Sequence, residues 1–106
     1  MHNSIDIKVR TDVTGRDIHA FVYLLQNLSS TFYVASNGRR VSGASIIGII
    51  SLGICKGSVL TIVANNENKE LIVEDLFAVK HFFENLYTDH VIREQQESDN
   101  NGTDKS

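Results

Sequence analysis

Three polar side chains stand where helices are predicted to begin, and each belongs to a residue type with a known phosphate chemistry. Asp17 and His19 lie in the segment 15–20, and Ser45 precedes an apolar run. A helix N-terminus steadies an anion through its free backbone amides and its dipole. A histidine carries phosphate as a phosphoramidate, an aspartate as an acyl phosphate and a serine as a phosphate ester. These are the candidate site residues, and their use depends on the elements that hold them.

The spacing of apolar residues defines these elements. Ile5, Ile7 and Val9 alternate with polar residues, as on the buried face of a strand, and the pair Asn37-Gly38 favours a tight hairpin turn. The predicted elements are a strand over residues 4–10, a helix over 16–28, strands over 31–36 and 39–42, a helix over 45–53, a strand over 58–64 and a helix over 68–87.

This order of elements, βαββαβα, predicts a single α+β domain. We expect a two-layer sandwich in which a four-stranded antiparallel sheet is covered on one face by three helices. The domain is expected to span residues 1–92. Residues 93–106 include no apolar side chain to bury, so they are predicted to form a disordered polar tail.

Composition and charge exclude several classes of function. With 106 residues the chain can bury one core and is too short for a deep two-domain cleft. A net charge of −3 and ten scattered Lys and Arg residues argue against nucleic acid or an anionic membrane as the partner. The single Cys55 makes no internal disulfide, and neither a signal peptide nor a membrane span is visible, so we expect a cytoplasmic protein. No cofactor or metal site is predicted.

Residues 36–38 and 45–57 resemble the histidine-containing phosphocarrier protein, HPr, of the bacterial sugar phosphotransferase system. These segments read SNG and SIIGIISLGICKG, and the order of elements agrees with HPr over residues 4–87. The closest resemblance is to HPr of the Gram-positive type, and within it to the catabolite-repression branch that lacks the active-site histidine. The resemblance implies an HPr-like open-faced sandwich.

The loop that carries the phosphorylated histidine in HPr differs in this sequence. In the family it reads Gly, an apolar residue, the histidine, then Thr, Arg and Pro. Aligned on Gly15, Asp17 takes the place of the histidine, His19 that of the arginine and Ala20 that of the proline. The resemblance therefore implies a protein that is neither a phosphocarrier nor an enzyme.

Three interpretations of Asp17 are open at this point. It is an exposed first-turn acid beside the helix dipole, with Thr14 or Asp12 as the cap, or it presents a fixed negative charge to partners that sense phosphorylated HPr. The third is an acyl phosphate site, although such sites gather several acids around Mg²⁺ and only Asp12 is near. His19 is either an ordinary first-turn histidine or an atypical phosphate carrier, and about 200° of helix separates it from Asp17.

Ser45 aligns with the serine that an ATP-dependent kinase phosphorylates in Gram-positive HPr, which turns that protein into a corepressor. Without the resemblance, Ser45 is a plain helix cap. Ile46, Ile47 and Ile50 are predicted to form an outward apolar cluster for docking, with simple core packing as the alternative. Ala44 stands where relatives often carry a lysine beside the serine, and this departure bears on recognition by the kinase.

The resemblance, with Asp17 in place of the histidine, implies a regulatory protein of the catabolite-repression type, phosphorylated on Ser45. Its expected partners are proteins, namely HPr kinase/phosphorylase and a catabolite-control transcription regulator, which contact Asp17, His19 and the three isoleucines. The alternatives are an atypical phosphocarrier acting through His19 and a competitor of HPr in which Asp17 mimics phosphate. The resemblance allows either a monomer or a dimer that exchanges its first strand.

Overall fold

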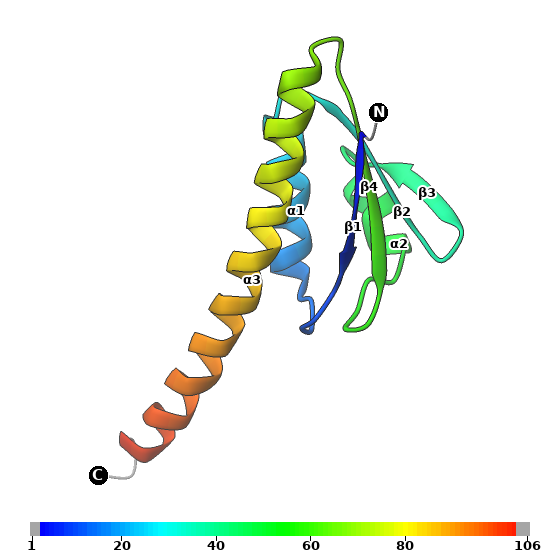
Figure 1. Ribbon diagram of the computed structural model, residues 1–106. Helices are drawn as coiled ribbons and strands as arrows, with labels where there is room; N and C mark the ends of the chain where they lie inside the picture. Colours follow the sequence, from blue (N-terminus) through cyan, green and yellow to red (C-terminus); the bar gives the residue numbers. More distant parts are fainter. Residues whose placement is uncertain (1–2, 104–106) are drawn as a thin grey trace.

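The computed structural model describes residues 3–103, with side chains described through residue 89. Its elements are β1 (Ser4–Lys8), α1 (Gly15–Asn27), β2 (Thr31–Ser36), β3 (Arg39–Ser42), α2 (Ile46–Ser51), β4 (Val59–Asn65) and α3 (Lys69–Thr103), shown in Figure 1. The predicted order and fold class are confirmed. The two hairpin strands have the predicted bounds because Asn37, with a φ of 54°, and Gly38, with a φ of 77°, form the tight turn between them.

The four strands form one antiparallel sheet in the order β1-β4-β2-β3. β4 pairs with β1 on one side, where Ile7 lies opposite Leu60, and with β2 on the other side, where Val34 lies opposite Ile62. β3 continues the sheet beyond β2, and its Val41 lies opposite Val34. The outer edges of the sheet are therefore β1 and β3.

The hydrophobic core lies between the sheet and the helices, because alternate strand residues point to one face. The strand residues buried on this face include Phe32, Val34, Leu60, Ile62 and Ala64. α1 and α3 lie side by side over the sheet in Figure 1, and the rings of Phe21 and Phe83 join them in an edge-to-face contact with 5.3 Å between centroids. α2 completes the helical layer next to α1.

The last helix is longer than predicted. The sequence analysis ended it near residue 87, whereas α3 continues to Thr103 and extends beyond the sheet in Figure 1. The prediction was wrong because it followed apolar spacing alone: residues 93–97 are Arg, Glu and Gln, which favour helix, and an existing helix extends more easily than a new one forms. The predicted disordered tail thus overlaps the helix up to Thr103, and the domain boundary at residue 92 stays a prediction. Neither α3 nor another helix within residues 3–103 has the length and hydropathy needed to cross a membrane.

The backbone at Gly43 lies close to Phe32 and Leu25, and this contact positions the start of α2. The Gly43 N–H donates to the Phe32 carbonyl oxygen at 2.8 Å, which ties the end of β3 to β2. A Cβ atom at Gly43 would lie 2.8 Å from the Phe32 Cβ and 2.9 Å from a Leu25 methyl carbon. Glycine therefore fits there without displacing buried neighbours, and Ser45 follows two residues later.

We expect Gly43→Ala to lower the free energy of unfolding by about 1–3 kcal/mol, because the added methyl group overpacks the contact with Phe32 and Leu25. Chemical denaturation followed by circular dichroism measures the change. Gly15→Ala is the matched control, since nothing lies within 4 Å of a Cβ atom at that position and alanine is the better helix former. An equal loss of stability in both variants would contradict the close-packing explanation.

Candidate functional site

A reciprocal pair of hydrogen bonds closes the N-terminus of α1. The Thr14 Oγ1 accepts from the Asp17 N–H at 3.1 Å, and the Asp17 Oδ2 accepts from the Thr14 N–H at 2.9 Å. This is a capping box, in which each side chain satisfies a backbone donor of the other residue. Of the two predicted caps, Thr14 and Asp12, the helix uses Thr14. The spacing Thr-x-x-Asp is the sequence signal for this pairing, and the sequence analysis missed it.

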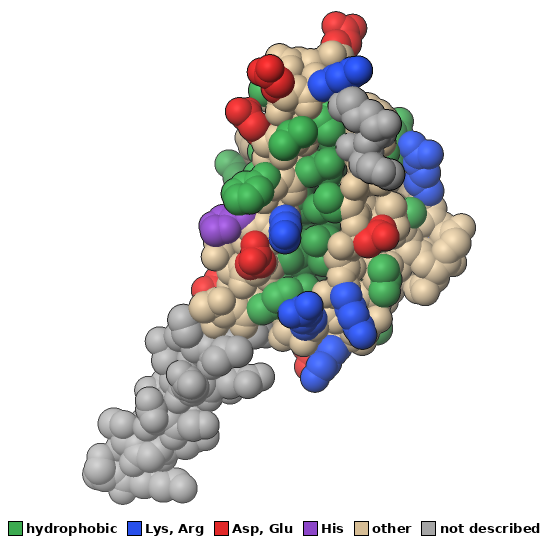
Figure 2. Space-filling model, viewed as in Figure 1, with side chains coloured by type: hydrophobic (Ala, Val, Ile, Leu, Met, Phe, Trp, Pro, Cys, Tyr) green, Lys and Arg blue, Asp and Glu red, His purple; other side chains and the backbone are tan. Residues whose placement is uncertain are grey.

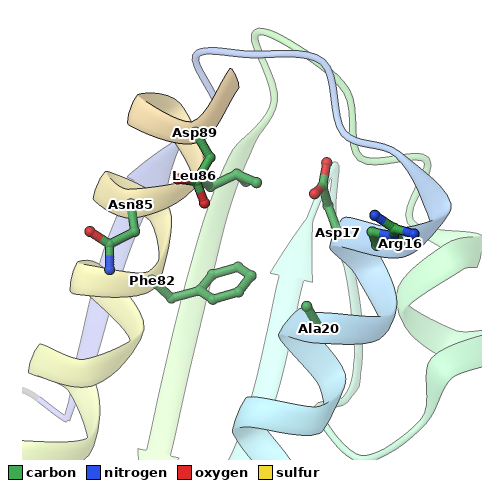
Figure 3. A pocket seen from close by; sticks show the side chains of 7 residues that line it. All are labelled: Arg16, Asp17, Ala20, Phe82, Asn85, Leu86 and Asp89. Carbon is green, nitrogen blue, oxygen red and sulfur yellow. The ribbon is translucent and has the colours of Figure 1, made fainter. Parts of the chain in front are cut away.

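The Asp17 side chain is buried, contrary to the expectation of an exposed first-turn acid. Only 6% of its surface is exposed, because its carboxylate turns back to Thr14 and the residue lies where α1 faces α3. Figure 3 shows Asp17 beside an open hollow of about 430 Å³ between the two helices. The residues that line this hollow are Arg16, Asp17 and Ala20 of α1 and Phe82, Asn85, Leu86 and Asp89 of α3.

This geometry bears on the three interpretations of Asp17. A buried carboxylate that accepts the Thr14 N–H presents little of its charge to a partner surface. An acyl phosphate site needs further acids around Mg²⁺, and within residues 3–89 no three His, Cys, Asp or Glu side chains are placed to share a metal ion. The contacts of Asp17 support the interpretation of a first-turn acid that stabilises α1.

His19 is exposed on α1, and the fold does not bring it together with Asp17. Two residues turn an α-helix by about 200°, so His19 points away from the buried side that Asp17 occupies. His19 also lies beyond the free amides of the helix entrance, because the Ile18 N–H already donates to the Thr14 carbonyl oxygen at 3.1 Å. The imidazole is thus open to solvent but receives no anion-binding support from the end of α1.

Ser45 caps the short helix α2 from an exposed position. Its Oγ accepts from the Gly48 N–H at 3.0 Å. At the other end of α2, the Arg39 guanidinium donates to the Ser51 carbonyl oxygen at 2.9 Å. Sequence reasoning did not find Arg39, because no local pattern connects β3 to the end of α2. The Ser45 hydroxyl therefore stands on a helix that is held at both ends.

The predicted apolar cluster of α2 is exposed at two of its three positions. Ile47 is 78% exposed and Ile50 is 56% exposed, whereas Ile49 is fully buried. Ile46 is partly buried and packs against the core, so its predicted place in the outward cluster is wrong. Ile46 lies one helical turn before Ile49 and shares its inward side. Ile47 and Ile50, called the α2 apolar pair below, follow Ser45 on the outer side of the helix.

A family comparison covers both helix entrances. Residues 1–81 match the family model described as the PTS HPr component phosphorylation site, where PTS is the sugar phosphotransferase system. The chain belongs to the HPr family. The match includes the capping box of α1, Ser45 and the α2 apolar pair, so the resemblance first seen at residues 36–38 and 45–57 is confirmed.

Two relatives in the HPr family are HPr-like Crh proteins. Crh of Halalkalibacterium halodurans is 26% identical over 78 residues, which cover 74% of this chain and 93% of that protein. Crh of Bacillus subtilis is 24% identical over 78 residues, which cover 74% of this chain and 92% of that protein. These similarities confirm the predicted placement of the chain near the catabolite-repression branch of HPr.

Solved HPr structures share the fold. HPr-C-His from Thermoanaerobacter tengcongensis has a TM-score of 0.64 at 26% identity, covering 78% of this chain and 96% of that one. HPr from Bacillus anthracis has a TM-score of 0.61 at 27% identity, covering 72% of this chain and 93% of that one. The protein is therefore an HPr-like open-faced sandwich related to the sugar phosphotransferase system.

The capping box predicts that Thr14→Ala and Asp17→Ala each lower the free energy of unfolding by about 0.5–2 kcal/mol, because each leaves a backbone N–H at the start of α1 without its acceptor. The double variant should lose less than the sum of the two, since both substitutions break one unit. Urea denaturation of the four proteins measures this coupling. Asp12→Ala, at the cap that is not used, should have little effect, and strictly additive losses at residues 14 and 17 would argue against a reciprocal cap.

Proposed function

We propose that this HPr-like protein is a non-enzymatic regulator, with Ser45 as its phosphorylation site and the α2 apolar pair as its docking surface. The main support for the proposal is that Ser45, at the start of α2, is exposed whereas Asp17, at the start of α1, is buried. The Ser45 hydroxyl is exposed on the helix that carries Ile47 and Ile50. Asp17, which alignment on Gly15 puts at the place of the HPr histidine, is instead buried in a capping box.

Phosphorylation of Ser45 is compatible with an intact α2. The Ser45 Oγ serves as an acceptor for the Gly48 N–H, and a phosphate oxygen can take over this role. The contacts of Arg39 with Ser51 lie at the opposite end of the helix and do not involve Ser45. The modification would therefore add nearly two negative charges to the surface of α2 while leaving its attachment to the sheet in place.

The α2 apolar pair supports docking of a protein partner. Both isoleucines expose more than half of their surface, and exposed apolar side chains grouped on one face favour an interaction site. A partner that covers Ile47 and Ile50 would also sense the charge at Ser45. We propose HPr kinase/phosphorylase as the enzyme that modifies Ser45 and a catabolite-control transcription regulator as the partner of the modified protein. The similarity to Crh supports both assignments.

Phosphoryl transfer through His19 is the alternative, and the exposure of its imidazole favours it. The position of His19 beyond the free amides of α1 weighs against efficient transfer, because these amides would steady the phosphoryl group. A role of Asp17 as a mimic of phosphorylated HPr has less support, since its carboxylate is buried and bonded to Thr14.

The proposal places the protein in the cytoplasm, where a single Cys55 stays reduced. It allows a monomer or a dimer that exchanges β1. One solved structure of Bacillus subtilis Crh is described as a swapped dimer, and in this chain β1 is an edge strand that pairs with β4 alone. Exchange of β1 between two copies would preserve the same strand pairing.

With ATP and an HPr kinase, the protein is expected to gain one acid-stable phosphate, and Ser45→Ala is expected to gain none. With phosphoenolpyruvate and enzyme I, no phosphate is expected, because an aspartate stands at the place of the carrier histidine. Intact mass before and after acid treatment measures both reactions, with an ordinary HPr as the positive control. An unmodified Ser45 under conditions that modify that control would end the regulator proposal. An acid-labile phosphate that His19→Ala abolishes would establish the alternative.

Replacing Ile47 and Ile50 together by serine should weaken binding of the phosphorylated protein to a catabolite-control regulator by at least about tenfold, because the partner loses its apolar contact. Isothermal titration calorimetry measures the dissociation constant. Phe77→Ser is the matched control, since Phe77 is 70% exposed on a different helix, α3. Unchanged binding of the isoleucine variant would place the docking surface elsewhere.

A further inference from the structure

Basic side chains that are scattered in the sequence come together at one end of the sheet. Lys8 is the last residue of β1, Arg10 follows two residues later, and Lys80 lies on α3. The turn that carries Lys56 bonds through its backbone to the end of β1. Figure 2 shows Lys and Arg side chains gathered over this end of the molecule. The chain has ten Lys and Arg residues and a net charge of −3, so this is a local excess of positive charge.

Three of these side chains line a groove between β1 and α3. Lys8, Arg10 and Lys80 border a hollow of about 240 Å³, in which Ile7 and Phe83 supply apolar lining. All three basic side chains are exposed, and none forms an ion pair with another residue in the part of the chain whose side chains are described. Their charge is therefore available to an anion from solution.

Two carboxylates also border the groove, and they offset two of its three positive charges. The Asp6 Oδ1 accepts from the Thr61 hydroxyl at 2.7 Å, so this carboxylate is engaged with the neighbouring strand β4. Glu84 lies on α3, one turn after Lys80. The lining thus has three positive and two negative side chains, and the nearby Lys56 adds to the positive excess.

Tyr87 holds the two walls of the groove together. Its hydroxyl donates to the Lys8 carbonyl oxygen at 2.7 Å, which joins α3 to the outer edge of β1. Burial raises the pKa of the Tyr87 phenol, and the effect of Arg10 lowers it in part, so the hydroxyl keeps the proton that it donates at neutral pH. The end of β1, with Lys8 and the following Arg10, is therefore fixed against α3, which carries Lys80, before any ligand binds.

We propose that this groove binds a small organic phosphate, with Lys8, Arg10 and Lys80 around the dianion and Ile7 and Phe83 against the organic part. Three cations from two elements suit a group with two charges and three acceptor oxygens better than a single carboxylate. The groove of about 240 Å³ has room only for a small ligand, and Ile7 and Phe83 place apolar side chains next to its charged ones. This groove is separate from Ser45 and α2, so the proposal of a phosphate site does not depend on the proposed function.

Phenyl phosphate is the probe, because it joins a phosphate dianion to an apolar ring. Titration into the ¹⁵N-labelled protein should shift the amide signals of residues 7–10 and 80–87 along one saturating curve. Arg10→Glu and Lys80→Glu, on different elements, should each raise the dissociation constant at least about tenfold, and Glu84→Gln should lower it. Lys69→Glu is the matched control, because it makes the same change in net charge about 16 Å along α3 from Lys80.

The site is supported if the unmodified protein and Lys69→Glu bind phenyl phosphate saturably while Arg10→Glu and Lys80→Glu do not. The absence of saturable shifts up to about 20 mM phenyl phosphate would overturn it. Equal weakening by Lys69→Glu would also overturn it, because the effect would then follow net charge alone. Equal affinity for benzoate would overturn the assignment to a phosphate dianion. Circular dichroism of each variant separates loss of binding from loss of folding.

Discussion

Leu60 and Ile62 have no exposed surface, and the strand that carries them, β4, is bonded to β1 on one side and β2 on the other. Because the helices form a layer on one face of the sheet, each of them has to pack against the same inward side chains of the central strands. The entrance of α1 at Thr14 and the entrance of α2 at Ser45 are both placed by this one core. Removing its central contacts would therefore displace both candidate sites.

Features of the fold with local causes were predictable from the sequence. Alternation over residues 31–36 and the positive-φ pair Asn37-Gly38 fixed the bounds of the hairpin, and a cap hydroxyl at Ser45 located the start of α2. The end of α3 was missed for a physical reason: a solvated helix needs no apolar stripe, so its length follows from propensity and not from burial. The order of the elements predicted the two-layer arrangement as well, because a single sheet of four strands can bury only one face against three helices.

The candidate site was harder to predict, because the surroundings of its residues come from distant segments. Asp17 has the residue type of an exposed first-turn acid, yet it lies where α1 faces α3. Lys8 and Lys80 are far apart in the sequence and line one groove because α3 packs on the sheet and Tyr87 bonds to β1. The exposure of Ile47 and Ile50, by contrast, follows from the short helix itself, so it was predictable.

The capping box of α1 bears on how this chain can evolve. Aspartate and histidine codons differ only in their first base, so Asp17→His is a short mutational step. The folded chain would nevertheless lose the acceptor of the Thr14 N–H and would have to accommodate an imidazole between α1 and α3. A variant with histidine at this position would need compensating changes in the cap and in α3 at the same time. The same two hydrogen bonds that stabilise the helix entrance thus oppose the replacement of Asp17 by histidine.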